Sequence, residues 1–319
     1  MDLYRSVRAV TAASGEGAVD WDAVSEAAKA GTDPGSLELT AADRAGYAAD
    51  VRAARGRLRE LSGTEFDVPN SLTVQNRYHW IDANVDTFRR VMEPIEDEVE
   101  TLFPNVSRVA NTGTMAATLG FLARHVLGQY DPLLLADDPA DHGLYFVDPN
   151  IRRVAGELDV GYERFRRWIA FHEVAHAAEF GAAPWLPDYL ESRLESGVRT
   201  LSRGGIDREA FVELDAAMTA VEGYAELLMD RAFDEAYADL RRKVDERRSG
   251  GGPVGQLVRR LLGMGLKRRQ YERGTRFFET VVEKRGLEAA GTVWERPENL
   301  PTGGELDRPE LWIERVDPS

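Results

Sequence analysis

The segment WIAFHEVAHAAEF, residues 168–180, places two histidines four positions apart, with a glutamate directly after the first. On an α-helix, His172 and His176 lie one above the other on a single face, with Cβ atoms about 5–6 Å apart. Two imidazoles in this arrangement can hold one tetrahedral metal ion. Glu173 points about 100° round the helix, so it flanks such an ion and can reach a water beside it. The H-E-x-x-H pattern therefore predicts two metal ligands and a general base.

The alternative is a chance pair of core histidines. Phe165 and Ile169 precede His172 on the same stripe, and the small residues Ala175, Ala177 and Ala178 surround it, so this face is expected to be buried. A buried pair without a metal would need other partners for four ring nitrogens. The chain has no cysteine, so a zinc ion would use histidine nitrogen and carboxylate oxygen. We therefore favour a zinc site.

A catalytic zinc needs a third protein ligand and one open position. The segment AVEGYAELLMD (220–230) carries Glu222 and Glu226 four residues apart on an otherwise apolar helix. Buried carboxylates need a positive partner, whereas a solvated helix face is the simpler alternative. One acid would complete the coordination, and the other would accept a hydrogen bond from a ligand histidine. The four-residue spacing of these two acids resembles that in glutamate-type zincins, in which the first acid binds the metal and the second orients a histidine. This favours Glu222 as ligand and Glu226 as acceptor. The same four-residue spacing from Glu226 to Asp230 leaves open the alternative that Glu226 is the ligand and Asp230 the acceptor.

Helical patterns dominate the elements that must position these side chains. The main helices are predicted at 40–63, 75–103, 112–128, 161–180 and 207–248. Thr40 and Gly63 mark the ends of the first, Pro94 is expected to break or bend the second, and Gly128 is expected to cap the third. The clearest strand, 143–151, is expected to stand alone or to pair with one neighbour, and its edge is a candidate for binding an extended peptide.

These patterns predict a mainly α fold. We expect a single helical domain over residues 1–319, with residues 1–70 as a semi-separate N-terminal helical layer. The short β element around 143–151 is expected near the active-site helix.

Composition excludes some partners. The chain has 319 residues, 55 acidic and 40 basic, for a formal charge of −15, whereas a phosphate-binding surface is basic. Nucleic acid is therefore not an expected partner. The most apolar run is interrupted by Arg124 and is too short to cross a bilayer. The first ten residues lack the apolar stretch of a signal peptide. We expect a cytoplasmic protein with no membrane partner; its oligomeric state is not indicated.

Several segments besides the zinc motif carry a resemblance to a known family. They are WIDANVDTF (80–88), LARHVLGQYD (122–131), LYFVDPNI (144–151), FHEVAHAAEF (171–180), PWL (184–186), EGYAE (222–226) and the stretch 267–302. Over roughly residues 75–316, the chain resembles the zincin-like hydrolases, with HExxH and EGxxE/D motifs, of actinobacteria, chloroflexi and haloarchaea. Some members are labelled as associated with deazaflavin-coenzyme biosynthesis. The resemblance implies a helical zincin-like fold and metallopeptidase activity, and it supports Glu222.

One feature departs from compact thermolysin-like enzymes. The spacing of 46 residues from His176 to Glu222 is longer, which leaves room for a helical insertion and weakens any analogy between the substrate clefts.

The leading hypothesis is a zinc-dependent hydrolase that acts on a peptide or a small amide. A zinc-activated water would attack the amide, with Glu173 as general base. Tyr271 is the first candidate for a donor to the developing oxyanion, ahead of Tyr224 and Tyr189. One alternative is hydrolysis of a small metabolite. A closed pocket would favour a metabolite, whereas a long groove would favour a peptide. Another is a non-catalytic, zinc-stabilised binding protein, in which Glu173 would have no use as a base.

Overall fold

The computed structural model describes residues 2–14, 17–63, 66, 69, 71–96, 104–131, 143–202, 207–249 and 265–317. These residues form mostly helices, together with one three-stranded sheet, which confirms the predicted fold class. They belong to two compact units. Unit 1 contains Met1–Arg44, Ser71–Val154 and Glu195–Asp207, and unit 2 contains Ala45–Asn70, Ala155–Leu194 and Arg208–Ser319.

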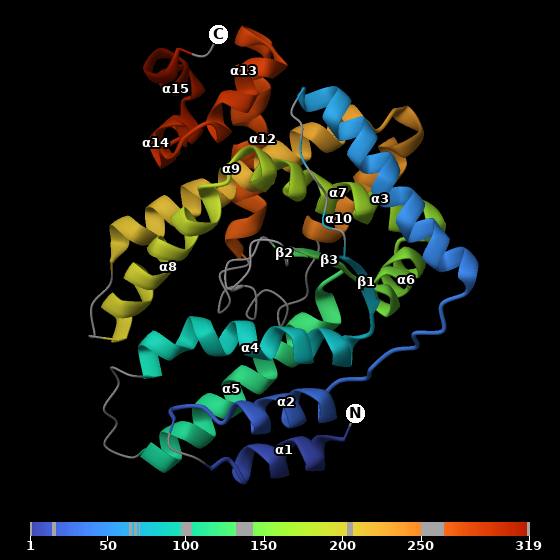
Figure 1. The fold of residues 1–319 in the computed structure, drawn as a ribbon, viewed down its shortest axis with the longest axis vertical. Helices are drawn as coiled ribbons and strands as arrows, with labels where there is room; N and C mark the ends of the chain where they lie inside the picture. The colour runs from blue at the N-terminus through green and yellow to red at the C-terminus, as the bar shows by residue number, and fades with distance from the viewer. Residues whose placement is uncertain are drawn as a thin grey trace. The chain divides into compact units, whose positions relative to one another are not determined.

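Unit 1 is built on four helices that pack against one another. They are α1 (Leu3–Thr11), α2 (Trp21–Ala30), α4 (Arg77–Glu96) and α5 (Pro104–His125), drawn in blue to green in Figure 1. Their apolar faces meet in a core that includes the fully buried Val24, Ile81 and Leu119. The helix predicted at 75–103 continues through Pro94 to Glu96, so this proline does not end it.

The sheet of unit 1 has the strand order β1-β3-β2, with β1 at Ser71–Gln75, β2 at Gly128–Asp131 and β3 at Gly143–Val147. β3 pairs with β1 in parallel and with β2 in antiparallel orientation. The expectation that this strand stands alone or has one neighbour is therefore wrong, and β3 has no open edge for a peptide. The strand ends at Val147, where α6 (Asp148–Glu157) begins. Gly128 starts β2 and does not cap α5.

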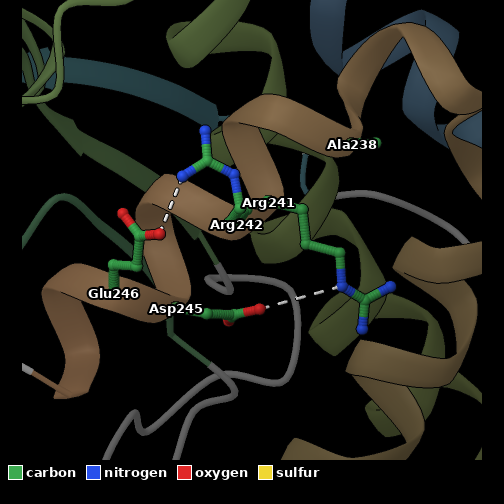
Figure 2. A pocket seen from close by; sticks show the side chains of 5 residues that line it. All are labelled: Ala238, Arg241, Arg242, Asp245 and Glu246. Carbon is green, nitrogen blue, oxygen red and sulfur yellow. Dashed lines mark hydrogen bonds and ion pairs between the residues drawn. The ribbon is translucent and has the colours of Figure 1, made fainter.

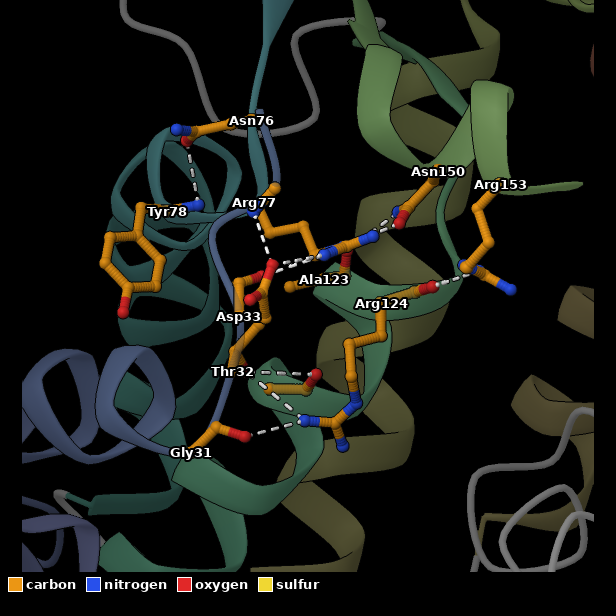
Figure 3. A network of polar contacts seen from close by, with 12 residues as sticks. Gly31, Thr32, Asp33, Asn76, Arg77, Tyr78, Ala123, Arg124, Asn150 and Arg153 are labelled. Atoms are coloured by element: carbon orange, nitrogen blue, oxygen red, sulfur yellow. Dashed lines mark hydrogen bonds and ion pairs between the residues drawn. The ribbon is translucent and has the colours of Figure 1, made fainter. Parts of the chain in front are cut away.

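Polar side chains of unit 1 complete the carboxyl-terminal end of α5 (Figure 3). The amide of Asn150 donates to the carbonyl of Ala123 at 2.8 Å, and Arg153 donates to the carbonyl of Arg124 at 2.7 Å. Arg77 in turn donates to the Asn150 side-chain oxygen at 2.7 Å. The last carbonyls of a helix have no partner within the helix and carry a partial negative charge. Asn150 and Arg153 thus supply partners for two of these carbonyls.

Unit 2 holds most of α3 (Ala41–Ser62), α7 (Tyr162–Ala182), the first half of α8 (Leu186–Ser202), α9 (Arg208–Ala232), α10 (Ala238–Ser249) and α12 (Gly265–Arg285). α9 packs against both α7 and α12. The helix predicted at 207–248 is interrupted: the carboxylate of Asp234 accepts from the N–H of Ala236 and caps a short 3-10 turn, Glu235–Tyr237. The prediction at 40–63 is confirmed, since the Thr40 hydroxyl accepts from the N–H of Asp43 at 3.1 Å.

Helix α7 is buried on nearly every side, with no narrow apolar stripe, as expected for a helix inside a core. Its charged residue Arg166 forms a 2.7 Å ion pair with Asp50 of α3. The same guanidinium lies 5.4 Å from the ring centres of both Tyr47 and Tyr162. A buried cation is tolerated only with such partners, so this cluster fixes α7 to α3.

Three short helices after α12 pack on it: α13 (Leu287–Gly291), α14 (Gly303–Asp307) and α15 (Pro309–Val316). The 3-10 turns Thr292–Trp294 and Pro297–Asn299 connect α13 to α14. Arg315 joins them by donating to the Glu305 carboxylate at 2.6 Å and to the carbonyl of Leu300 at 3.0 Å. Across all the described helices, none combines the length and the apolar content required to cross a membrane.

Candidate metal centre

The two histidines of the HExxH segment lie together on α7, and one glutamate of α9 joins them. The rings of His172 and His176 are 4.7 Å apart at their centres and inclined by 75°. Both side chains are half-buried, whereas Glu222 is buried. One nitrogen of each histidine and one oxygen of Glu222 all lie within 4.8 Å of one another. Two segments 46 residues apart thus supply a convergent set of donors.

This donor set fits a zinc ion. Two imidazole nitrogens with one carboxylate oxygen form the ligand set of several catalytic zinc sites, and such a set leaves a fourth position open. Atoms no more than 4.8 Å apart share a point at most about 2.8 Å from each of them, and zinc bonds of about 2.1 Å would require only small side-chain rotations from there.

Sequence reasoning missed a further acid at this centre. Glu179 on α7 is fully buried, and its Oε2 lies 2.9 Å from Nδ1 of His176. A hydrogen bond to the second ring nitrogen fixes the tautomer and the orientation of a ligand histidine. The signal was present in the sequence, since Glu179 follows His176 by three residues and lies on the same helix face. The predicted role of Glu226 as an acceptor for a ligand histidine remains a prediction.

The charges around His176 favour its protonated form in the metal-free protein. Burial opposes that charge, but the hydrogen bond and charge of Glu179, followed by the charges of Glu222 and Glu173, raise the pKa of His176 to about 9. Burial also raises the pKa of Glu179 to about 7, against the effect of His176. The pair therefore carries a proton on the imidazole, which a metal would have to displace.

Three buried carboxylates act on His176: Glu173 and Glu179 on α7, and Glu222 on α9. Bringing several negative charges into a protein interior is costly unless a positive charge compensates them. A divalent cation shared by the histidines and Glu222 would offset part of this charge. The buried negative charge and the donor geometry thus both favour a divalent metal ion at this site.

The three tyrosines suggested by sequence differ in their surroundings. Tyr224 is buried, with its ring 5.2 Å from that of Phe278 and 5.5 Å from that of Trp294, and burial raises its pKa. Tyr189 is half-buried on α8, and the guanidinium of Arg193 lies 4.1 Å from its ring centre. Tyr271 belongs to α12, but its side chain lies outside the described part of the chain. Its proposed role therefore stays a prediction.

A hollow elsewhere in unit 2 does not belong to this centre. It is lined by Ala238, Arg241, Arg242, Asp245 and Glu246, all on α10 (Figure 2). Arg242 pairs with Glu246 at 2.7 Å, and Arg241 with Asp245 at 4.0 Å, each one helical turn apart. The hollow is therefore a solvated helix face whose charges compensate one another, in agreement with the interleaved acids of the sequence.

Comparison with known proteins identifies the family of the chain. The model of a family described as zincin-like metallopeptidases matches residues 19–207 and 197–313, and the chain therefore belongs to that family. A crystal structure from Chloroflexus aurantiacus, described as "a putative hydrolase with a novel fold", is similar with a TM-score of 0.74 and 31% sequence identity. The similarity covers 100% of this chain and 99% of that chain. None of the curated proteins matches.

Proposed function

We propose that the protein is a zinc-dependent hydrolase that cleaves an amide bond. His172, His176 and Glu222 would hold the ion, because their donor atoms are the ones that converge from α7 and α9. When bound, zinc lowers the pKa of a coordinated water toward 7 and polarises the carbonyl of the substrate.

Glu173 is the proposed general base. It directly follows His172, is buried beside the histidines, and its charge acts on His176. In the reaction, its carboxylate accepts a proton from the attacking water while the new C–O bond forms. It then donates that proton to the amide nitrogen as the C–N bond breaks, which regenerates the carboxylate. A buried carboxylate suits this role, because a site that excludes bulk water strengthens proton transfer within it.

Glu179 is proposed to hold His176 in place. Its hydrogen bond to Nδ1 leaves the other ring nitrogen of His176 to face the ion. Glu226 is proposed to serve His172 in the same way, and Tyr271 to donate to the developing oxyanion. The observation that carries the proposal is the convergence of the two histidines and Glu222 beside a buried Glu173.

The test combines metal analysis with a variant of the base. Purified wild-type protein and Glu173→Gln are each analysed for bound metals by mass spectrometry, and both are expected to contain about one zinc per chain. Both are then assayed on quenched fluorescent peptide libraries and on a panel of small amides. Cleavage by the wild type and its loss in Glu173→Gln is the expected result, because the variant keeps the ligands and loses the base.

Three controls define the outcomes. Glu222→Gln is expected to lose most of the zinc, and Glu163→Gln, an exposed acid in the first turn of α7, is expected to keep both zinc and activity. Cleavage restricted to the small amides would assign a metabolite substrate in place of a peptide. Wild-type protein that binds no zinc when zinc is supplied in excess would refute the proposal.

A further inference from the structure

We propose that the contact between Gly223 of α9 and Gly274 of α12 positions Glu222 for metal binding; this inference rests on the proposed role of Glu222 as a ligand. The two glycines are buried and lie where the helices cross. A Cβ atom placed on Gly223 would lie 2.4 Å from both Cα and the carbonyl carbon of Gly274. A Cβ atom on Gly274 would lie 2.3 Å from the carbonyl oxygen of Thr219. The two backbones are therefore in direct contact.

The crossing point is next to the proposed ligand in sequence and on an adjacent helix face. Gly223 directly follows Glu222, so the two residues point in directions that differ by about 100° around the axis of α9. Thr219 precedes Gly223 by four residues and lies on the same face. This face of α9 therefore meets the backbone of α12, whereas the face that carries Glu222 supplies the donor that converges with the histidines of α7. The contact with α12 thus sets the position and rotation of α9 where Glu222 leaves it.

Side chains on both sides of the glycines hold the crossing in register. Arg273 of α12 lies 3.7 Å from the Asp215 carboxylate on α9 and donates to the Asp307 carboxylate of α14 at 2.8 Å. Asp215 lies one turn before Thr219 on the same face of α9. On the other side, the ring of Phe278 packs edge-on against Tyr224 at 5.2 Å. The helices can neither slide nor roll without breaking these contacts.

The expected loss of zinc affinity follows from the steric overlap that an added methyl group would create at the crossing. Real Cβ atoms keep at least 3.0 Å from other atoms, so a methyl group on Gly274, at 2.3 Å, would drive the two backbones apart by about 0.7 Å. Zinc–ligand distances hold to within about 0.2 Å, so after a shift of this size Glu222 reaches the ion only by leaving its present side-chain conformation. Helix backbones, unlike the end of a flexible side chain, cannot rotate away. We therefore expect Gly274→Ala to bind zinc at least tenfold more weakly than the wild type.

The experiment measures metal binding directly. Zinc affinity is determined by competition with a chromophoric chelator for the wild type, Gly223→Ala and Gly274→Ala. The visible absorption spectrum of bound Co²⁺ reports whether the coordination geometry changes. Circular dichroism confirms the fold. Weaker zinc binding and an altered Co²⁺ spectrum in a folded variant are the expected results; a purely structural role would leave the spectrum unchanged.

Two control variants separate positioning from general stability. Gly56→Ala changes an exposed helical glycine of α3 with no atom within 4 Å of the added group, and its zinc affinity is expected to equal that of the wild type. Leu58→Ala removes a fully buried side chain of α3, so it lowers the melting temperature without touching the crossing. Its zinc affinity is expected to remain within twofold of the wild type.

A milder variant decides the question if the glycine variants do not fold. Arg273→Gln adds no atoms at the crossing but removes the link from α12 to Asp215 and Asp307. It is expected to bind zinc about threefold more weakly than the wild type. The effect is small because a partly exposed ion pair contributes little free energy. Arg276→Gln, an exposed arginine one turn along α12, serves as its control.

Failure of this inference is distinguishable from failure of the proposed function. If Glu222→Gln weakens zinc binding but a folded Gly274→Ala binds zinc like the wild type, with the same Co²⁺ spectrum, the positioning role is refuted and the ligand assignment stands. Where the glycine variants do not fold, unchanged affinity in Arg273→Gln refutes the positioning role equally. If Glu222→Gln itself binds zinc like the wild type, the ligand assignment is wrong, and the inference falls with it.

Discussion

The fully buried carboxylate of Glu179 offers the sharpest test of the proposed metal centre. Its Oε2 lies 2.9 Å from Nδ1 of His176. Replacement by leucine keeps the side-chain size but removes the acceptor, so the imidazole loses its fixed orientation. A hydrogen bond to a charged group contributes about 1.5–3 kcal/mol, which corresponds to about a 10- to 100-fold change in an equilibrium constant. Losing an acceptor behind a zinc-binding histidine is known to weaken metal binding by a similar factor.

The assay is a zinc titration in competition with a chromophoric chelator at pH 7.5. Glu179→Leu is expected to bind zinc about 10- to 100-fold more weakly than the wild type. Glu179→Gln keeps an acceptor oxygen without the charge, so its zinc affinity is expected to fall between the two. Glu163→Gln controls for the loss of a charge on the same helix, because this acid is exposed. A folded Glu179→Leu variant that binds zinc as tightly as the wild type would refute the reasoning.

Three further predictions concern stability. Removal of zinc with EDTA is expected to lower the melting temperature measured by calorimetry, since free zinc at a hundred times its Kd contributes about 2.7 kcal/mol; an unchanged transition would contradict a folded-state zinc site. Asp50→Asn, which leaves Arg166 buried without its charged partner, is expected to lower the free energy of unfolding in urea by about 3–5 kcal/mol, and a loss below 1 kcal/mol would contradict it. Burial opposes the charge of Glu305, but hydrogen bonds from Arg315 and Thr302 lower its pKa. Its stabilisation is therefore present above the ordinary pKa near 4.5 and is lost as the pH falls through the lower folded value. Glu305→Gln is accordingly expected to destabilise the protein in urea at pH 7 and to have little effect at pH 2, whereas equal effects at both pH values would contradict the linkage.

Local patterns allowed the proposed ligands to be predicted from sequence. His172 and His176 lie four residues apart on one helix, so helical geometry alone brings them together. Glu222 was found because an acid on an apolar helix needs a compensating charge, and the structure places its carboxylate within reach of both histidines. Glu179 was not predicted, because a glutamate three residues after a histidine fits a solvated helix face equally well, and the sequence does not show that this position is buried. The spacing that relates Glu179 to His176 is as local as that between the two histidines.

The parts of the fold that sequence did not reveal depend on distant contacts. The segment 143–147 has the composition of a strand, but nothing local indicates that its neighbours are 71–75 and 128–131. Gly128 matches the preference for glycine just after a helix, but α5 already ends at His125 and Gly128 starts β2. The contact between Gly223 and Gly274 is likewise invisible in a single sequence, because either glycine alone suggests only a locally weaker helix.

The central place of β3 in its sheet has a consequence for synthesis on the ribosome. β1 and β2 both pair with β3, so neither has its partner until residues 143–147 leave the exit tunnel. About seventy residues separate β1 from β3, and at about 5–20 residues per second their synthesis lasts about 4–15 s. During that interval the nascent chain can form its local helices, while β1 exposes unpaired backbone groups. Chaperones that recognise extended segments would find their target in this window.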